Sequence, residues 1–146
     1  MLLSCIVLIS YSIYWFFVLF QPLEHIGTTF DSGKIVFEIR NLGPSHLVVE
    51  SVEFNKEAVE GLKVGVSYNG HSVVGSGILN SPDIFYLPPD SLRVLPMDSK
   101  NHEQYGILID FLPTYGSFEI SYYYMGIKKS LTIMFNEDKY PNIENY

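Results

Sequence analysis

The first twenty residues of the chain contain no charged side chain and no glycine or proline. A helix rises 1.5 Å per residue, so about 20 apolar residues are needed to cross the ~30 Å hydrocarbon core of a bilayer. Pro22 ends such a helix, because it cannot donate a backbone hydrogen bond and disfavours helical geometry at Gln21. The sequence therefore predicts a transmembrane helix over residues 1–21, acting as a signal anchor, and a linker over residues 22–33.

The predicted anchor is apolar along its whole length. The large apolar side chains that we assign to it are Leu2, Leu3, Ile6, Val7, Leu8, Ile9, Ile13, Trp15, Phe16, Phe17, Val18, Leu19 and Phe20. Aromatic residues gather in its second half, as is typical of segments that meet a membrane–water interface.

Two other interpretations of residues 1–20 are open. A cleaved signal peptide normally has a basic start and a cleavage site between small residues, and this segment shows neither. A buried core helix is an unusual role for a fully apolar run of this length at a chain terminus.

The orientation of the chain in the membrane is not set by its basic residues. The nearest ones after the run are Lys34 and Arg40, so the positive-inside rule gives little information about which side the domain lies on. We expect a single-pass protein of the cell membrane with its domain outside the cytoplasm, because the rest of the chain has an all-β character.

The net charge limits the classes of binding partner, and the cysteine content indicates the cellular compartment. The chain has 16 acidic and 9 basic residues, for a net charge of −7. This balance argues against nucleic acid and against anionic lipid headgroups as partners, because both bind basic surfaces. The only cysteine, Cys5, lies within the predicted anchor. The domain therefore has no disulfide framework, which fits a prokaryotic or archaeal envelope better than an animal cell surface.

Short alternating segments separated by turn residues follow the anchor. In residues 34–40, Ile35, Phe37 and Ile39 face one side, and the polar residues and Val36 face the other, as in a half-buried strand. The alternation of residues 46–54 slips near Glu50, which predicts a bulge. Further strands are predicted over residues 62–68, 71–79, 91–95, 107–112, 117–124 and 127–135, with turns at 69–70 and 125–126.

These strands predict one all-β domain over residues 34–135. About eight strands at regular spacing, without an amphipathic helical segment, are typical of a sandwich or barrel. We expect an immunoglobulin-like antiparallel β-sandwich of about seven to nine strands. Residues 136–146 form a polar tail containing proline, which we expect to be loosely ordered.

The residues with catalytic or metal-binding chemistry are scattered. The four histidines (His25, His46, His71 and His102) have no metal-ligand spacing, and the domain lacks the thiolate that blue-copper and dinuclear copper sites require. No G-x-S-x-G nucleophile elbow is present, and the Gly-Ser-Gly sequence at 75–77 lacks the lysine of a phosphate-binding loop. We expect no metal, no cofactor and no catalytic activity.

Two segments near the C-terminus are candidates for protein contact. The run Tyr122, Tyr123 and Tyr124 is explained by rings alternating between core and surface, or by outward rings that contact a partner. The strand at 127–135 carries charge only at its start, and Thr132, Ile133 and Phe135 lie in its uncharged second half. An exposed edge there would pair with another strand. The alternative is a central strand that is already paired on both sides.

The segment KIVFEIRNLGPSHLVVESVEFN at residues 34–55 resembles the strand–Asn-x-Gly–strand pattern of archaeal envelope sandwich proteins. These are the anchored stator and accessory proteins of the archaellum and the archaeal type IV pilin-like subunits. Here the turn is Asn41-Leu42-Gly43, and residues 86–91 and 112–118 resemble the starts of later strands in such domains. The resemblance covers most of the chain in architecture, through short motifs that recur in many extracellular sandwiches.

The resemblance implies a structural protein of the envelope whose sandwich binds the cell-wall layer, a sister subunit or a second copy of itself. Two alternatives are a filament subunit with its helix in the filament core, and an accessory subunit of a respiratory or transport complex. Pilin helices favour Ala, Gly and Val for tight packing, whereas this segment has Tyr, Trp and Phe. A processed pilin would also carry a basic residue and glycine before its cleavage point. These departures favour the anchored accessory protein over the filament subunit.

Overall fold

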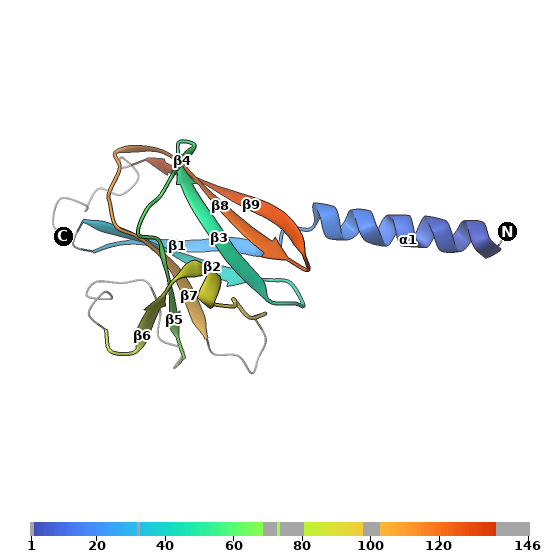
Figure 1. Ribbon diagram of the computed structural model, residues 1–146, viewed down its shortest axis with the longest axis horizontal. Coiled ribbons are helices and arrows are strands. Elements are labelled where there is room, and N and C mark those ends of the chain that lie inside the picture. The colour runs from blue at the N-terminus through green and yellow to red at the C-terminus, as the bar shows by residue number, and fades with distance from the viewer. Residues whose placement is uncertain (1, 32, 69–72, 74–80, 98–102, 137–146) are drawn as a thin grey trace.

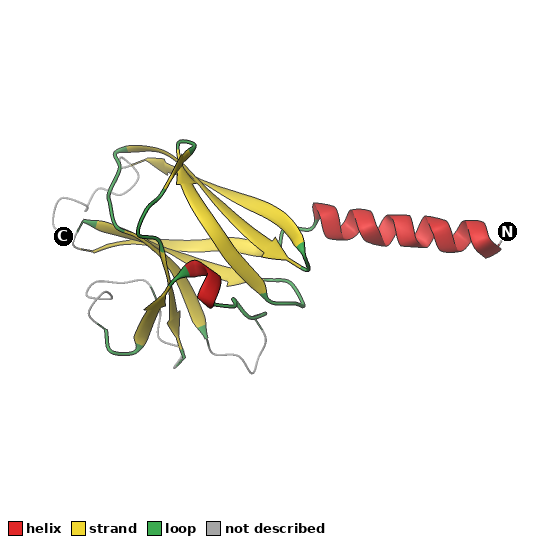
Figure 2. Cartoon of the chain, in the orientation of Figure 1, coloured by secondary structure: helices red, strands yellow, loops and turns green. Residues whose placement is uncertain are grey.

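The computed structural model describes residues 2–31, 33–68, 73, 81–97 and 103–136. Within these ranges one α-helix precedes nine strands and a short 3-10 helix (Figures 1 and 2). In chain order the elements are α1 (Leu2–Leu19), β1 (Leu23–Asp31), β2 (Lys34–Asn41), β3 (Leu47–Phe54), β4 (Glu57–Ala58), β5 (Lys63–Ser67), β6 (Ile84–Leu87), η2 (Pro89–Ser91), β7 (Gln104–Ile109), β8 (Tyr115–Tyr124) and β9 (Ile127–Asn136).

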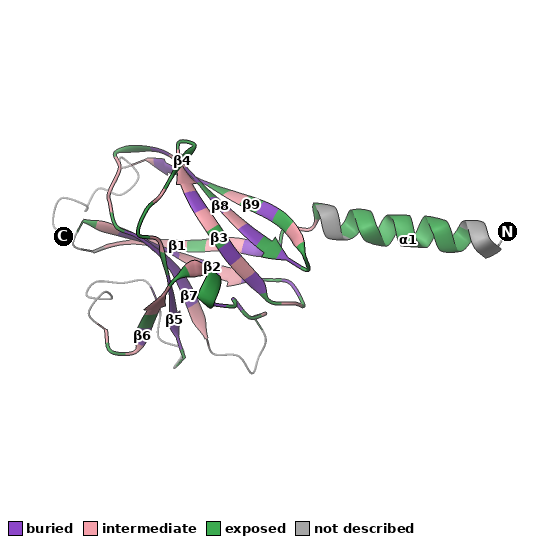
Figure 3. Ribbon diagram, viewed as in Figure 1, coloured by how far each residue is buried: buried purple, intermediate pink, exposed green. Residues whose placement is uncertain are grey.

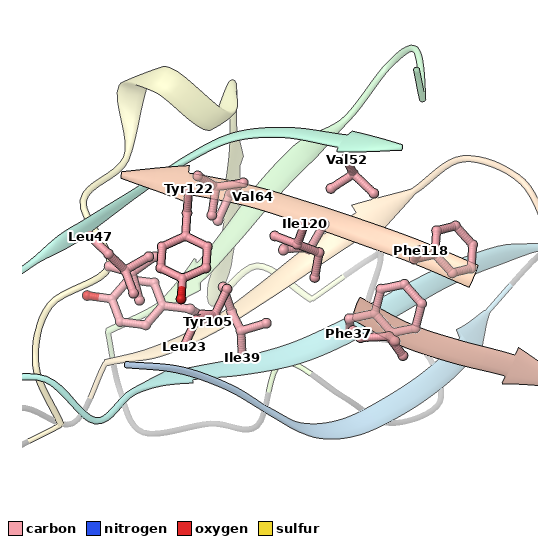
Figure 4. Packing of buried hydrophobic residues seen from close by; sticks show 14 of the residues in the cluster. Leu23, Phe37, Ile39, Leu47, Val52, Val64, Tyr105, Phe118, Ile120 and Tyr122 are labelled. Carbon is pink, nitrogen blue, oxygen red and sulfur yellow. The ribbon is translucent and has the colours of Figure 1, made fainter. Parts of the chain in front are cut away.

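The strands form two antiparallel sheets that pack face to face. The first sheet has the order β1-β2-β7-β5-β6, and the second has the order β4-β3-β8-β9. The core lies between them: Phe37 of the first sheet and Phe118 of the second are both buried, with ring centroids 5.0 Å apart (Figure 4). The prediction of an all-β domain built as a two-layered sandwich is therefore confirmed.

Strand β2 shows the alternation that the sequence predicts. Ile35, Phe37 and Ile39 face the other sheet and are buried, whereas Glu38 on the opposite face is partly exposed. Val36 also points to the outer face, where a small second cluster with Val73, Ile84 and Leu108 buries it. The predicted slip in β3 is confirmed as well, because its register with β8 shifts between Val49 and Ser51.

The Asn41-Leu42-Gly43 turn is held by the Asn41 side chain. Its Nδ2 donates to the carbonyls of Ser45 at 2.8 Å and Val94 at 2.9 Å, and its Oδ1 accepts from the backbone N–H of Gly43 at 2.9 Å. The ring of Tyr124 packs so closely on Gly43 that a Cβ there would lie 2.6 Å from the tyrosine hydroxyl oxygen. The Asn-x-Gly motif thus has a structural explanation within the fold.

Residues 22–33 differ from the linker that the sequence predicts, because most of them form β1. This strand pairs with β2 along its whole length, from Leu23 opposite Asn41 to Asp31 opposite Lys34. A bulge between His25 and Gly27 interrupts the pairing. The extra residue at a bulge breaks the two-residue period, which removes the alternation by which a strand is recognised in a sequence.

Other strands depart from their predicted bounds. Residues 91–95 form no extended strand: η2 ends at Ser91, and only an isolated bridge joins Val94 to Leu47. Strand β6 was not predicted, because its four residues lie between Pro82 and Pro88. Strand β7 begins three residues before the predicted strand at 107–112. The predicted hairpin at 69–79, apart from Val73, and the tail at 137–146 lie outside the described residues.

Helix α1 extends away from the sandwich (Figure 1). Its described side chains are mostly apolar and exposed, including Val7 at 61 % and Leu8 at 64 % (Figure 3). The helix meets the domain through Phe20, whose ring centroid lies 6.3 Å from that of Tyr124. A helix is therefore present where the sequence predicts one. Among the helices in the described part of the chain, none has both the length and the apolarity needed for a membrane span.

Candidate interaction surface at strand β9

The β8–β9 hairpin fixes which backbone groups of β9 face outward. Its two turn residues, Met125 and Gly126, have φ angles of 51° and 77°, as a tight two-residue hairpin turn requires. The flanking residues Tyr124 and Ile127 pair directly. They form a hydrogen-bonded pair in such a turn, and hydrogen-bonded and non-bonded pairs then alternate along the ladder. The odd-numbered residues of β9 therefore bond to β8, and the even-numbered ones direct their N–H and C=O groups away from it.

Strand β9 is the last strand of its sheet. In the described residues it pairs with β8 alone. Strand β1 belongs to the other sheet and contacts β9 through Phe30, whose ring centroid lies 5.8 Å from that of Phe135, without joining its ladder. Such an edge is a ready template for another strand. Within the described residues, β9 thus lies at the edge of its sheet, unlike the alternative in which the strand at 127–135 is central and paired on both sides.

The half of β9 nearest the helix is protected. The Gln21 side chain donates from Nε2 to the carbonyl oxygen of Ser130 at 2.6 Å, which occupies one outward group. Lys128 forms an ion pair with Glu50 at 2.6 Å. Lys129 is 9 % exposed and lies on the inward-facing side of the strand, where burial lowers its pKa. Charged residues that point inward on an edge strand are a known defence against edge-to-edge pairing.

The far half of β9 lacks these protections. Its outward backbone groups belong to Thr132 and Met134, and no strand in the described residues pairs with them. The side chain of Met134 is 59 % exposed, and Tyr115 of β8, 68 % exposed, lies diagonally across the ladder from it, since Met134 pairs with Ser117 and Tyr115 with Asn136. No charged residue lies between Ser130 and Asn136. This half therefore combines open backbone groups with an adjacent apolar patch.

The side chains predicted as contact residues divide between core and surface. Tyr123 and Thr132 are exposed. Tyr122, Tyr124, Ile133 and Phe135 are buried, so they offer no side-chain surface to a partner. The tyrosine run thus alternates between core and surface, as one of the two sequence interpretations predicts. Burial also raises the pKa of Tyr122 to about 12.

Sequence reasoning missed Met134 and Tyr115 as surface residues. Both belong to strands whose buried positions follow a two-residue period. The tight turn at Met125-Gly126 fixes the register, so counting outward from it identifies the exposed side chains. The turn residues and the alternation therefore suffice to identify Met134 and Tyr115 as exposed, once residues 115–136 are taken as a hairpin.

The described residues contain no group of three or more His, Cys, Asp or Glu side chains that could hold a metal ion. His25 lies in β1 and His46 in the turn before β3, while His71 and His102 fall outside the described residues.

Comparison of the chain with protein-family models, with curated proteins and with solved structures finds no match in any of the three.

Proposed function

We propose that this chain is a non-catalytic interaction protein of the cell envelope, anchored in the membrane by its N-terminal helix. Its sandwich works by protein–protein contact, through addition of a partner strand at the far half of β9. The observation that carries the proposal is the contrast within that strand: Gln21, Lys128 and Lys129 protect one half, whereas Thr132 and Met134 leave the other open. A protein that only had to avoid aggregation would protect the whole edge.

The membrane anchor rests on residues 1–20 and on the exposure of the helix. The segment has no charged residue, and apolar side chains such as Ile6, Ile9 and Phe16 are more than half exposed. A continuous apolar surface of this kind marks a contact with lipid or with another protein. Lipid is the better match, because the apolar side chains surround the helix instead of forming one stripe. The domain would then lie outside the cytoplasm.

The resemblance of residues 34–55 supports an accessory or stator role of the archaellum or pilus type, with an immunoglobulin-like sandwich. The protein partner would be the cell-wall layer, a sister subunit or a second copy. An accessory subunit of a respiratory or transport complex would use the same anchor and the same edge. The filament subunit is favoured by one observation, the exposure of helix α1, because the same apolar surface could pack against copies of itself.

Protease treatment tests the membrane topology. We expect protease added to intact cells to digest the domain and to leave a fragment containing residues 1–20 in the membrane fraction. Digestion only after lysis would place the domain on the cytoplasmic side. Recovery of the untreated full chain in the soluble fraction would contradict the anchor itself.

Cys5 distinguishes an anchored accessory protein from a filament subunit. It is the only cysteine of the chain, and it is exposed on α1. Packing of helices against copies of themselves would bring Cys5 residues together, so oxidation in native membranes would give disulfide-linked dimers. The accessory role predicts that the chain stays monomeric on a non-reducing gel. Cys5→Ser is the matched control, because it keeps the helix and removes the thiol.

A further inference from the structure

The first sheet, the layer that does not contain β9, carries a depression of about 280 Å³. Its polar lining includes Glu38 and Arg40 of β2, Glu103 just before β7 and Gln104 at the start of β7. Its apolar lining includes Ile26 at the β1 bulge, Leu95 and Met97 of the segment after η2, and the core residues Ile39 and Tyr105. Polar and apolar walls therefore meet in one hollow.

Glycines flank Glu38 in the two neighbouring strands. Across the sheet, Glu38 pairs with Gly27 of β1 on one side and with Gly106 of β7 on the other. At Gly106 a Cβ would lie 2.9 Å from Val36 Cγ1 and 3.0 Å from Val73 Cγ2, so these two valines fill the space above that glycine. Neither paired residue places a charged or polar side chain opposite the Glu38 carboxylate.

Among the residues that the structure describes, none forms a hydrogen bond or ion pair with the Glu38 carboxylate. Arg40 lies nearest to Glu24 instead, with a nitrogen–oxygen distance of 3.9 Å. The Glu103 carboxylate accepts a hydrogen bond from the Tyr105 hydroxyl. Burial raises the pKa of Glu38, and the positive charge of Arg40 opposes that shift only in part. Counted over the described residues alone, the carboxylates of Glu24, Glu38 and Glu103 outnumber the single guanidinium of Arg40 in this region.

We propose that this depression binds a basic side chain, an arginine or a lysine, of a protein partner. The alkyl stem of such a side chain would pack against Ile26, Leu95 and Met97, and its cationic head would pair with Glu38. Long basic side chains commonly bury their stems in this way while their charge is neutralised at the tip. A cation also complements the net negative charge of the site. Because the depression and β9 lie on different sheets, this site does not depend on strand addition.

Binding can be measured on the full-length, ¹⁵N-labelled protein in detergent micelles. The probes are Nα-acetylarginine amide and Nα-acetyllysine amide, and Nα-acetylnorleucine amide is the uncharged control. We expect saturable shifts of the Gly27 and Gly106 backbone amides with one or both cationic probes and none with norleucine. Glu38→Gln should weaken binding at least tenfold.

Matched variants separate the site from general electrostatics and from misfolding. Glu119→Gln removes one negative charge from the exposed face of β8 and should leave the affinity unchanged. Glu38→Asp keeps the charge and should retain binding better than Glu38→Gln. The amide spectrum of each variant shows whether it is folded. The proposal is overturned if no saturable shift appears, if norleucine binds equally well, or if folded Glu38→Gln binds like the original protein.

Discussion

Gln21 and Ser130 are joined by a hydrogen bond of 2.6 Å, in which the glutamine side chain donates to the backbone carbonyl. The two residues are 109 positions apart in the sequence, and they connect the end of the helix to the edge of the second sheet. This contact occupies an outward carbonyl of β9 at the point where the strand passes from its protected to its open half. In the proposed strand addition, this contact would set where a partner strand can begin to pair.

Amide hydrogen exchange should show the open half of β9 directly. In the isolated domain we expect the amides of Ile133 and Phe135 to exchange slowly, because they bond to β8. The amides of Thr132 and Met134 should exchange quickly, because they point away from it. Exchange measured residue by residue at low protein concentration tests this alternation. Slow exchange of all four amides at every dilution would show that the edge is already covered within one copy of the chain.

Asn41→Ala should destabilise the domain by about 2–4 kcal/mol. The buried side chain holds three backbone groups, and its removal leaves the carbonyl of Val94 and the N–H of Gly43 without that partner. Urea unfolding of the isolated domain gives the free energy of unfolding. Asn41→Asp is the matched control, because it keeps the acceptor for Gly43 and loses the two donated bonds. A loss below about 0.5 kcal/mol in Asn41→Ala would contradict this role.

His25 should make the domain less stable as the pH falls. Burial lowers the pKa of its imidazole below 6.5 in the folded state, although Nε2 donates to the Gly27 carbonyl at 2.8 Å. The unfolded chain therefore takes up a proton first, and stability decreases as the pH drops below about 6.5. Between pH 7 and pH 5, His25→Gln should lose less stability than the original domain. Equal pH profiles in the two proteins would contradict the assignment.

The sequence predicts those parts of the fold in which local patterns and tertiary contacts agree. Strand β2 and the β8–β9 hairpin follow their alternation and turn residues, and even the slip in β3 is visible near Glu50. Strand β1 escaped prediction because its bulge hides the period, and β6 because it is short and flanked by prolines. Local patterns alone could not predict the depression, because its lining comes from β1, β2, β7 and the segment after η2, which only the tertiary fold brings together.

The edge position of β9 could not be predicted for a related reason. Whether a strand is central or at an edge depends on the order of strands in the sheet, which local patterns do not encode. The uncharged run after Lys129 was compatible with both positions. In the described part of the chain the structure places β9 at the edge, and the contacts of Gln21 and the burial of Lys129 distinguish its two halves.

The most direct test of strand addition compares two lysine substitutions in the full chain in native membranes. Thr132→Lys places a charge on the open edge, whereas Glu119→Lys places one directly opposite, on the same face but in a strand paired on both sides. Chemical cross-linking followed by gel electrophoresis measures the complex that each variant forms. We expect Thr132→Lys to lose most of the cross-linked complex and Glu119→Lys to retain it. If both variants keep the complex in full, or if the original chain forms none, the account is contradicted.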